Sequence, residues 1–157
     1  MKYIFFFFFT LLFLAGCDSN RVFEDYKEFS DRTWKVNDPA VFEFQIKDIS
    51  KKYNLYYNVR NSLGYPYARI FVQYSLTDST GTELAKKLAS NFLFDQKTGR
   101  PLGRSGLGDV LDNQFLLIEN QSFKTEGTYH FRLDQFNRQD TLAGILAVGL
   151  RVETVNP

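Results

Sequence analysis

The sequence predicts an all-β protein, an antiparallel two-sheet β-sandwich that follows an N-terminal lipoprotein signal peptide. Three observations support this fold class. From residue 40 onward, apolar and polar residues alternate with period two in several short runs. Turn compositions rich in Gly, Asn, Asp and Ser separate these runs, and long amphipathic helical windows are absent. Residues 1–16 have the composition of a signal peptide and are excluded from the fold.

The signal peptide combines Lys2 with an apolar run, Tyr3–Leu14, that contains five successive Phe residues. This run is short of the roughly 20 residues that a membrane-spanning helix needs, and it fits the apolar core of a signal peptide. Leu14-Ala15-Gly16-Cys17 closes the segment with small residues ahead of a Cys, as a lipoprotein signal peptidase requires. Cys17, the sole Cys of the chain, is therefore expected to carry diacylglyceryl and acyl groups, and no other cofactor is expected.

Residues 17–37 are expected to form the lipidated tether, and residues 38–157 the β-sandwich domain. The tether is polar and charged, and as a free coil it would span roughly 25 Å root-mean-square. Its scattered aromatic residues leave two interpretations, a short helical stripe or, as we favour, docking of some rings against the edge of the domain. These aromatic residues are Phe23, Tyr26, Phe29 and Trp34.

Seven runs after the tether have the alternation of strands. In each run one row of side chains can enter the core while the other faces solvent or a second layer. The runs are 42–46, 55–60, 70–76, 88–94, 114–119, 129–134 and 146–153. The Gly-rich residues 102–109 are expected to form a long connection that crosses from one sheet to the other. Jelly-roll and immunoglobulin-like topologies both fit these strands, and the long connection favours the jelly roll.

The charge balance restricts the classes of partner. Positions 1–16 contain one basic and no acidic residue, so the rest of the chain holds 18 of each and has a formal net charge of zero. A neutral surface argues against nucleic acid, which requires a basic face. It also argues against electrostatic adhesion to anionic lipid, so the acyl chains are expected to hold the protein at the membrane. The expected location is the cell envelope, lipid-anchored and facing the periplasm.

The sequence contains no evident catalytic or metal-binding set, and the protein is interpreted as not an enzyme. His130 is the sole His, and no Gly-x-Ser-x-Gly elbow frames a nucleophile. The stretch Gly103–Asp109 lacks the order of a Rossmann or Walker loop and is interpreted as a connection that needs Gly for positive φ. Asp109, Asp112 and Asn113 lack the spacing of a calcium-binding loop.

Candidate contact residues come from a Tyr-rich stretch, residues 53–67, and from the Gly-rich connection. Exposed Tyr rings can stack on sugars or anchor a protein partner, and packing of these rings into the sandwich is an equally weighted alternative. The candidates for partner or glycan contact are Tyr56, Tyr65, Tyr67, Arg104 and Asp109. A carbohydrate-binding envelope lipoprotein is thus one alternative function, and a hydrolase that uses dispersed carboxylates is another.

Several segments, taken in their serial order, resemble one known family. They are Trp34, Pro39–Phe44, Tyr53–Asn61, Tyr65–Tyr67, Gly103–Asp109, Asp112–Gln114, Gly127–Tyr129 and Gly144–Glu153. Behind the Leu-Ala-Gly-Cys motif, this order is similar to the gliding-motility lipoprotein GldH family over nearly the whole chain after Cys17. The resemblance implies a non-enzymatic accessory role in gliding motility and the associated type IX secretion machinery, with envelope proteins as partners. It implies no catalytic residues.

Two tripeptides resemble the Asp-Ser/Thr-apolar pattern for periplasmic O-glycosylation in bacteria of the kind that this family implies. Ser79 follows Asp78, and Thr141 follows Asp140. Both tripeptides lie in expected loops, where a glycan would fit, so Ser79 and Thr141 are predicted acceptors.

Overall fold

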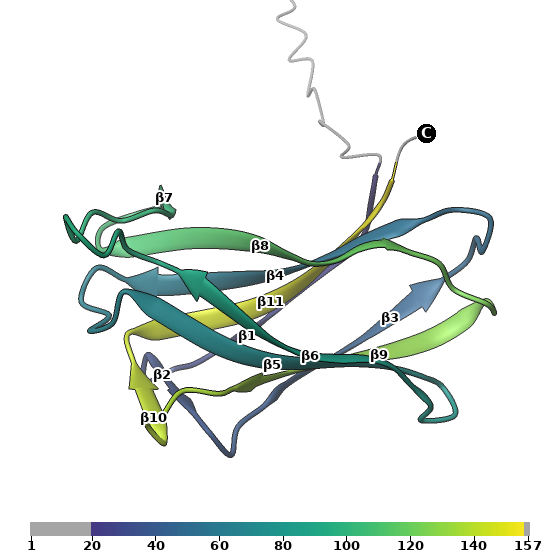
Figure 1. The fold of residues 1–157 in the computed structure, drawn as a ribbon, viewed down its shortest axis with the longest axis horizontal. Coiled ribbons are helices and arrows are strands. Elements are labelled where there is room, and N and C mark those ends of the chain that lie inside the picture. Colours follow the sequence, from purple (N-terminus) through teal and green to yellow (C-terminus); the bar gives the residue numbers. More distant parts are fainter. Residues whose placement is uncertain (1–19, 156–157) are drawn as a thin grey trace, which may run out of the picture.

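Eight long strands and three short ones make up the fold in a computed structural model, which describes residues 20–155 (Figure 1). The long strands form two antiparallel sheets that face each other across the core. The predicted all-β, antiparallel two-sheet sandwich is therefore confirmed. Across residues 20–155, no helix is long and apolar enough to cross a membrane.

The first sheet has five strands in the order β1-β11-β4-β8-β7. They are β1 (Arg21–Glu28), β11 (Ile145–Thr154), β4 (Tyr53–Ser62), β8 (Val110–Gln121) and β7 (Arg104–Ser105). The second sheet has four strands in the order β3-β9-β5-β6. They are β3 (Ala40–Ile46), β9 (Gly127–Gln135), β5 (Arg69–Asp78) and β6 (Glu83–Phe92). A separate pair joins β10 (Thr141–Ala143) to β2 (Thr33–Lys35).

The long strands pair in a nested order along the chain. β1 pairs with β11, β3 with β9, β4 with β8, and β5 with β6, all antiparallel. This winding, in which the first long strand pairs with the last and the middle two pair with each other, is that of a jelly roll. It decides between the two predicted topologies. The Gly-rich residues 102–109 lie on the crossing from β6 in the second sheet to β8 in the first, as predicted.

Period-two alternation places one row of side chains from each sheet in a shared core. β3 shows it most simply, because its odd-numbered residues are exposed and its even-numbered residues are buried. The buried row of β3 is Ala40, Phe42, Phe44 and Ile46. The ring of Phe44 lies 6.2 Å from that of Phe123 and 6.0 Å from that of Tyr129, so aromatic contacts join β3 to the segments that follow β8.

The structure corrects the predicted start of the folded domain at residue 38. Residues 21–28, assigned to the tether, are strand β1 at the edge of the first sheet. Trp34, also assigned to the tether, is fully buried and stacks on Phe29 with 5.8 Å between ring centroids. Its Nε1 donates a hydrogen bond to the carbonyl oxygen of Asp38 at 3.0 Å. These residues dock at the domain edge as strands, not as a helical stripe.

Gly149 permits the close pairing of β1 with β11. A Cβ added at Gly149 would lie 2.7 Å from the backbone oxygen of Asp25 and 2.7 Å from Cδ1 of Tyr26. Tyr26 pairs with Gly149 across the two strands, and its ring covers the glycine. Any larger residue at position 149 would push β1 off the sheet, so the N-terminal strand depends on this glycine.

Candidate functional site

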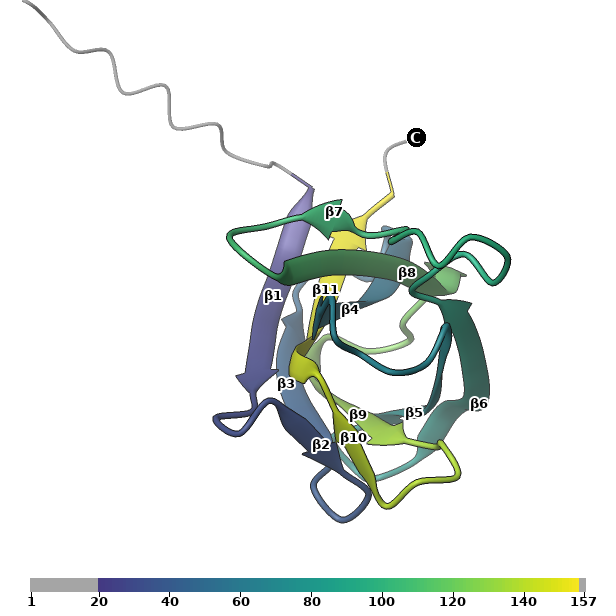
Figure 2. The same cartoon turned by 90° about the vertical axis from the view of Figure 1, so that its left-hand side faces the viewer.

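The two ends of the sandwich are formed by different segments of the chain. At the anchor end, the N–H of Thr154 donates to the carbonyl of Asn20, and that of Val155 donates to the carbonyl of Lys52, both at 2.8 Å. The start of β1, the end of β11 and the start of β4 therefore lie together. The distal end consists of the loops 63–68, 93–103 and 136–140, and Figure 2 looks along the sandwich from that side. The ten residues of β4 separate the two ends by about 30 Å.

An apolar groove of about 740 Å³ lies at the distal end, on the outer face of the second sheet. We term it the aromatic groove and define it by Tyr67, Phe71, Leu88, Phe136, Arg69 and Arg138. Tyr67, Leu88 and Phe136 are 37%, 52% and 55% exposed, so apolar side chains face solvent here. The volume falls within the usual range of ligand-binding clefts.

Alternation along β5 places the groove residues of this strand on the outer face of the second sheet. Ile70 and Val72 are buried, so Arg69 and Phe71 point to the outer face. The hydroxyl of the buried Tyr65 donates to the carbonyl oxygen of Arg69 at 3.2 Å. The start of β5 is thereby held in place by a ring inside the core.

The opposite wall of the groove is fixed by backbone contacts. The N–H of Phe136 donates to the carbonyl of Phe71 at 2.9 Å, and the side-chain amide of Asn137 donates to the same oxygen at 3.1 Å. The segment after β9 therefore continues alongside β5. The Phe136 ring is exposed although its backbone is anchored, an arrangement that suits a contact residue.

Arg69 supplies the groove with a cation that has no acidic partner. Its Cζ lies 4.0 Å from the centroid of the Phe92 ring and 5.8 Å from that of Phe71. Stacking on an aromatic face favours the cation and leaves the N–H groups at the edge of the guanidinium free to donate. The Nε of Arg69 is buried and has no hydrogen-bond partner, and no carboxylate between residues 20 and 155 forms an ion pair with this side chain.

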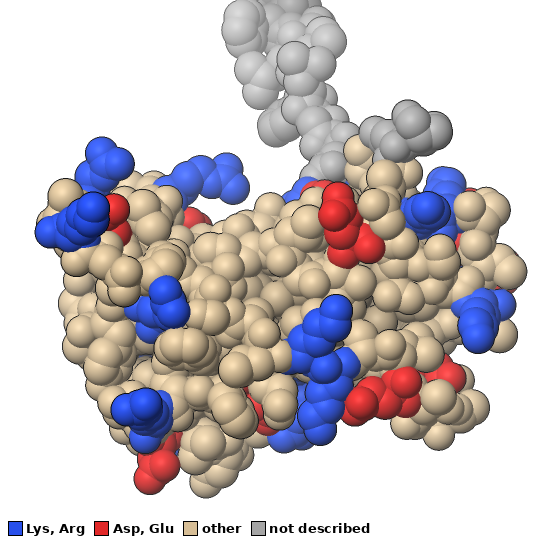
Figure 3. All heavy atoms as spheres, in the orientation of Figure 1, with Lys and Arg blue, Asp and Glu red and all other residues tan. Residues whose placement is uncertain are grey.

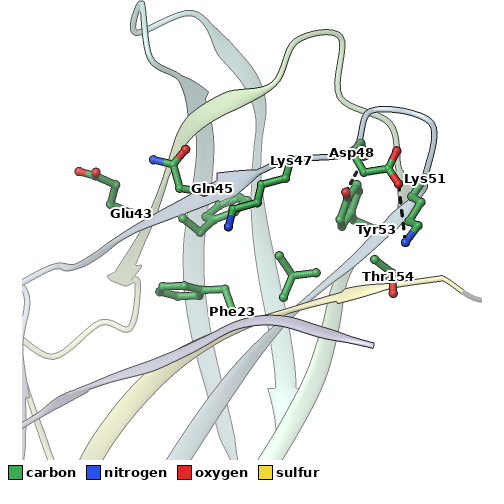
Figure 4. A pocket seen from close by; sticks show the side chains of 10 residues that line it. Phe23, Glu43, Gln45, Lys47, Asp48, Lys51, Tyr53 and Thr154 are labelled. Carbon is green, nitrogen blue, oxygen red and sulfur yellow. Dashed lines mark hydrogen bonds and ion pairs between the residues drawn. The ribbon is translucent and has the colours of Figure 1, made fainter. Parts of the chain in front are cut away.

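A second cavity, of about 490 Å³, opens at the anchor end beside β1 and β3 (Figure 4). Phe23 lies on one side of it, and Asp48, Lys51 and Tyr53 lie on the other. Lys51 Nζ lies 3.6 Å from a carboxylate oxygen of Asp48, and the Tyr53 hydroxyl donates to the Asp48 carbonyl at 2.6 Å. Hydrogen bonds from Ser50 hold the pKa of Asp48 below its usual value. Asp48, Lys51 and Tyr53 therefore already satisfy one another at this side of the cavity.

The outer face of the first sheet carries polar side chains that also satisfy one another. Arg60 pairs with Asp112 at 2.9 Å. The buried Asn58 donates to the Tyr26 hydroxyl at 2.8 Å and accepts from Gln114 at 3.0 Å. Such a closed network stabilises the sheet and presents few unpaired groups to a partner. On the side of the molecule seen in Figure 3, charges of both signs are scattered between broad uncharged areas.

The predicted contact residues do not lie together in the structure. Tyr67 lines the aromatic groove, whereas Arg104 lines a polar cavity on the outer face of the first sheet. Asp109 pairs with Arg32 at 2.9 Å, and its carbonyl accepts the N–H of Leu63 at 2.8 Å. Asp109 therefore ties the crossing loop to two distal turns.

The structure corrects the prediction that Tyr65 contacts a partner. Its ring is 5% exposed and its hydroxyl is already bonded to the chain, so it acts inside the core. Tyr53 and Tyr57 are 2% and 0% exposed, which matches the alternative that the Tyr-rich stretch packs into the sandwich. Tyr56 is half-buried on the outer face of β4.

The structure describes two of the three predicted modification sites. Ser79 is exposed in the turn between β5 and β6, as expected. The structure corrects the loop expected at Thr141, because this residue begins strand β10 and pairs with Lys35 of β2, although its side chain is exposed. Glycosylation stays a prediction. Cys17 lies outside the described residues, and its lipidation likewise stays a prediction.

Sequence reasoning did not single out Arg69, Phe71, Leu88 or Phe136. One signal was available, because Phe71 is an aromatic residue in a row of β5 that otherwise holds Gln73 and Ser75. A large apolar residue in the solvent-facing row of a strand marks a surface that another group can cover.

The fold and the groove define this chain as a jelly-roll β-sandwich with an exposed apolar cleft at one end. The family model described as GldH lipoprotein matches residues 21–152. The chain therefore belongs to the GldH lipoprotein family, which confirms the resemblance noted in the sequence.

Two curated relatives span nearly the same length. The "Gliding motility lipoprotein GldH homolog" of Christiangramia forsetii is 29% identical and aligns over 96% of this chain and 94% of its own. The "Gliding motility lipoprotein GldH" of Flavobacterium johnsoniae is 28% identical over 90% of each chain. The crystal structure of an infectious bursal disease virus VP2 subviral particle is 10% identical with a TM-score of 0.38, over 88% of this chain and 31% of that one. A similarity this low carries no argument about function.

Proposed function

We propose that this lipoprotein acts without catalysis, as an accessory component of gliding motility and the associated type IX secretion machinery, through protein contacts at its distal end. The observation that carries the proposal is the aromatic groove, in a chain of the GldH lipoprotein family. Exposed Tyr and Phe side chains beside Arg are residue types that are enriched at protein interfaces.

The short link between the lipid and β1 supports this orientation. Cys17, as the proposed lipid carrier, is four residues before Arg21, the first residue of β1. Four residues span at most about 14 Å when fully extended. The anchor end would therefore lie close to the lipid headgroups on the periplasmic side, with the aromatic groove about 30 Å farther from the membrane. In that position the groove is accessible to another envelope protein.

Carbohydrate binding has less support. That alternative depends on a platform of Tyr rings between residues 53 and 67, and three of those rings, Tyr53, Tyr57 and Tyr65, are buried. Tyr67 alone of this stretch contributes to the aromatic groove. A glycan array that gives no signal with the purified lipoprotein would remove this alternative.

Capture of partners in the native host tests the proposal. Chemical crosslinking followed by purification should recover gliding or secretion components with the wild-type protein. A variant with Tyr67→Ala and Phe136→Ala should recover at least about fivefold less, because two exposed anchors are lost. The matched control is Val41→Ala with Ile49→Ala, at positions 57% and 46% exposed outside the groove, and it should behave as wild type. Equal recovery by all three proteins, or no such component with any of them, would reject the proposal.

A further inference from the structure

We propose that the aromatic groove binds a protein segment in which a carboxylate adjoins an apolar side chain, with the Arg69 guanidinium as the partner of that carboxylate. The proposal rests on the protein-contact function proposed above, and it adds the chemical class of the bound segment. It follows from the charges that line the groove, from the geometry of Arg69, and from the apolar walls around it.

The charges that line the groove are of one sign. Arg69 and Arg138 are its charged residues, and none of the described residues that line it is Asp or Glu. Two acidic residues adjoin this lining in the chain, Asp95 before Gln96 and Asp140 after Gln139, and neither forms an ion pair with Arg69 or Arg138. The Asp95 carboxylate is occupied within its own turn, where it accepts hydrogen bonds from the N–H groups of Lys97 and Thr98. The fold therefore brings two cations to an apolar surface in a chain of balanced charge and supplies neither of them with a carboxylate.

The geometry of Arg69 prepares it for an anion. Its guanidinium is held over the Phe92 ring at 4.0 Å, and its backbone is held by the Tyr65 hydroxyl at 3.2 Å. Little side-chain freedom is left to lose when a ligand binds, which reduces the entropic cost of binding. The planar edge of a stacked guanidinium offers N–H groups in the spacing that a carboxylate accepts in a bidentate manner. A bound carboxylate would thus supply acceptors that the described chain does not.

The apolar walls of the groove indicate which kind of side chain should adjoin the carboxylate of the bound segment. Tyr67 and Phe136 stand on two different loops, and Leu88 and Phe71 form the sheet surface between them. This enclosure suits an aromatic or branched apolar side chain. An Asp, a Glu or a C-terminal carboxylate next to such a side chain matches both parts of the groove. A neutral sugar would leave the charge of Arg69 unmatched, and a phospholipid surface would lie at the opposite end of the sandwich.

A pair of small ligands of equal shape tests this chemistry. The mature lipoprotein, purified from membranes and placed in nanodiscs of zwitterionic lipid, is titrated with 3-phenylpropionate or its uncharged analogue 3-phenylpropionamide. Binding is followed by saturation-transfer difference NMR, with empty nanodiscs as the blank. The carboxylate should bind about tenfold more tightly than the amide, because a hydrogen bond to a charged group is stronger than one to a neutral group.

Three variants locate the binding. Arg69→Gln should reduce the affinity for the carboxylate about tenfold and leave the affinity for the amide nearly unchanged. Phe136→Ala should weaken both ligands, since its exposed ring contributes only apolar contact. Arg132→Gln is the matched control, because Arg132 lies outside the groove lining and pairs with Asp134 at 2.7 Å. It should change neither affinity. Unchanged thermal unfolding of each variant verifies that the fold is intact.

The results separate this inference from the proposed function. Equal affinity for the carboxylate and the amide, or carboxylate binding that Arg69→Gln leaves unchanged, would overturn the assigned chemistry even if partners are captured in the host. Selective carboxylate binding that depends on Arg69 would support it, even if host capture recovers no motility component and the proposed function fails.

Discussion

Replacement of Trp34 by Ala should destabilise the whole domain, although the residue lies in a segment whose composition is that of a tether. The Trp34 side chain is fully buried, stacks on Phe29 at 5.8 Å, and donates to the carbonyl of Asp38 at 3.0 Å. Truncating a buried Trp to Ala costs about 3–5 kcal/mol, a large part of the 5–15 kcal/mol that typically holds a domain folded. For a domain of this size, each kcal/mol lowers the melting temperature by about 4 °C, so we expect a decrease of about 12–20 °C.

Urea unfolding followed by far-UV circular dichroism measures this effect, because the signal of the sheets does not depend on the Trp. A second variant, Trp34→Phe, keeps a ring against Phe29 but loses the hydrogen bond, and we expect an intermediate loss of about 1–2 kcal/mol. Phe136→Ala is the matched control, since Phe136 is 55% exposed and should change stability by less than about 0.5 kcal/mol.

The loss of stability in Trp34→Ala tests whether Trp34 belongs to the cooperative core. A loss below about 1 kcal/mol would mean that Trp34 is not part of the cooperative core, and the assignment of β1 and β2 to the fold would be refuted. If Trp34→Ala does not fold at all, the graded loss in Trp34→Phe still gives the answer.

Four further predictions concern the sheet edge, pH, modification and anchoring. Gly149→Val should cost at least about 2 kcal/mol in urea unfolding, because its side chain would overlap β1. Burial raises the pKa of Tyr57 far above its ordinary value. The neutral Tyr57 therefore makes its full contribution to the free energy of unfolding below about pH 10, and this contribution is lost as the pH rises beyond that. Tyr57→Phe should therefore lose less stability than wild type between about pH 10 and pH 11, as measured by circular dichroism with absorbance at 295 nm. Intact-mass measurement of protein from the native host should show hexose-sized additions that disappear in a variant with Ser79→Ala and Thr141→Ala; an unmodified wild-type mass would dispose of that prediction. Cys17→Ala should release the protein from the membrane fraction and abolish its function in the host, and full function in this variant would overturn the role of the lipid.

The sequence could predict the fold class because the period-two pattern is strong in several strands. In β3 and β5 an apolar row alternates with a more polar one, and the structure buries the apolar row. The nested pairing could not be read from these strands, since alternation shows which face is buried but not which strand lies alongside. Only the length of the crossing before β8 favoured the jelly roll.

The N-terminal strand was missed for a physical reason. β1 is an edge strand, and its sequence of Arg, Glu, Asp and Lys around Val22, Phe23 and Tyr26 has the composition of a tether. The contacts that stabilise β1 are made with another segment, because β1 pairs with β11 and packs closely against Gly149 of that strand. Tertiary contacts of this kind override local composition and leave no periodic signal.

The candidate site was predicted only in part. Tyr67 is exposed and lines the groove, whereas Tyr65 of the same loop turns into the core. The two rings meet edge to face with 5.6 Å between their centroids. The groove joins β5 and β6 to the loops that carry Tyr67 and Phe136, which lie far apart in the chain, so no local motif could reveal it. Arg69 is ordinary in sequence, and its significance comes from the stacked Phe92 ring and from the lack of an ion-pair partner among residues 20–155.

Site-specific photo-crosslinking in the native host tests the central claim most directly. A photoreactive phenylalanine analogue is placed at Phe136 in the aromatic groove or, as the matched control, at Ile49 in the anchor-end turn, where the native residue is 46% exposed. The account predicts a discrete adduct with an envelope protein from position 136, its loss in the Arg69→Gln background, and no such adduct from position 49. The same adduct from both positions would contradict a contact made through the aromatic groove, and an adduct from position 136 that persists without Arg69 would contradict the role assigned to the Arg69 guanidinium.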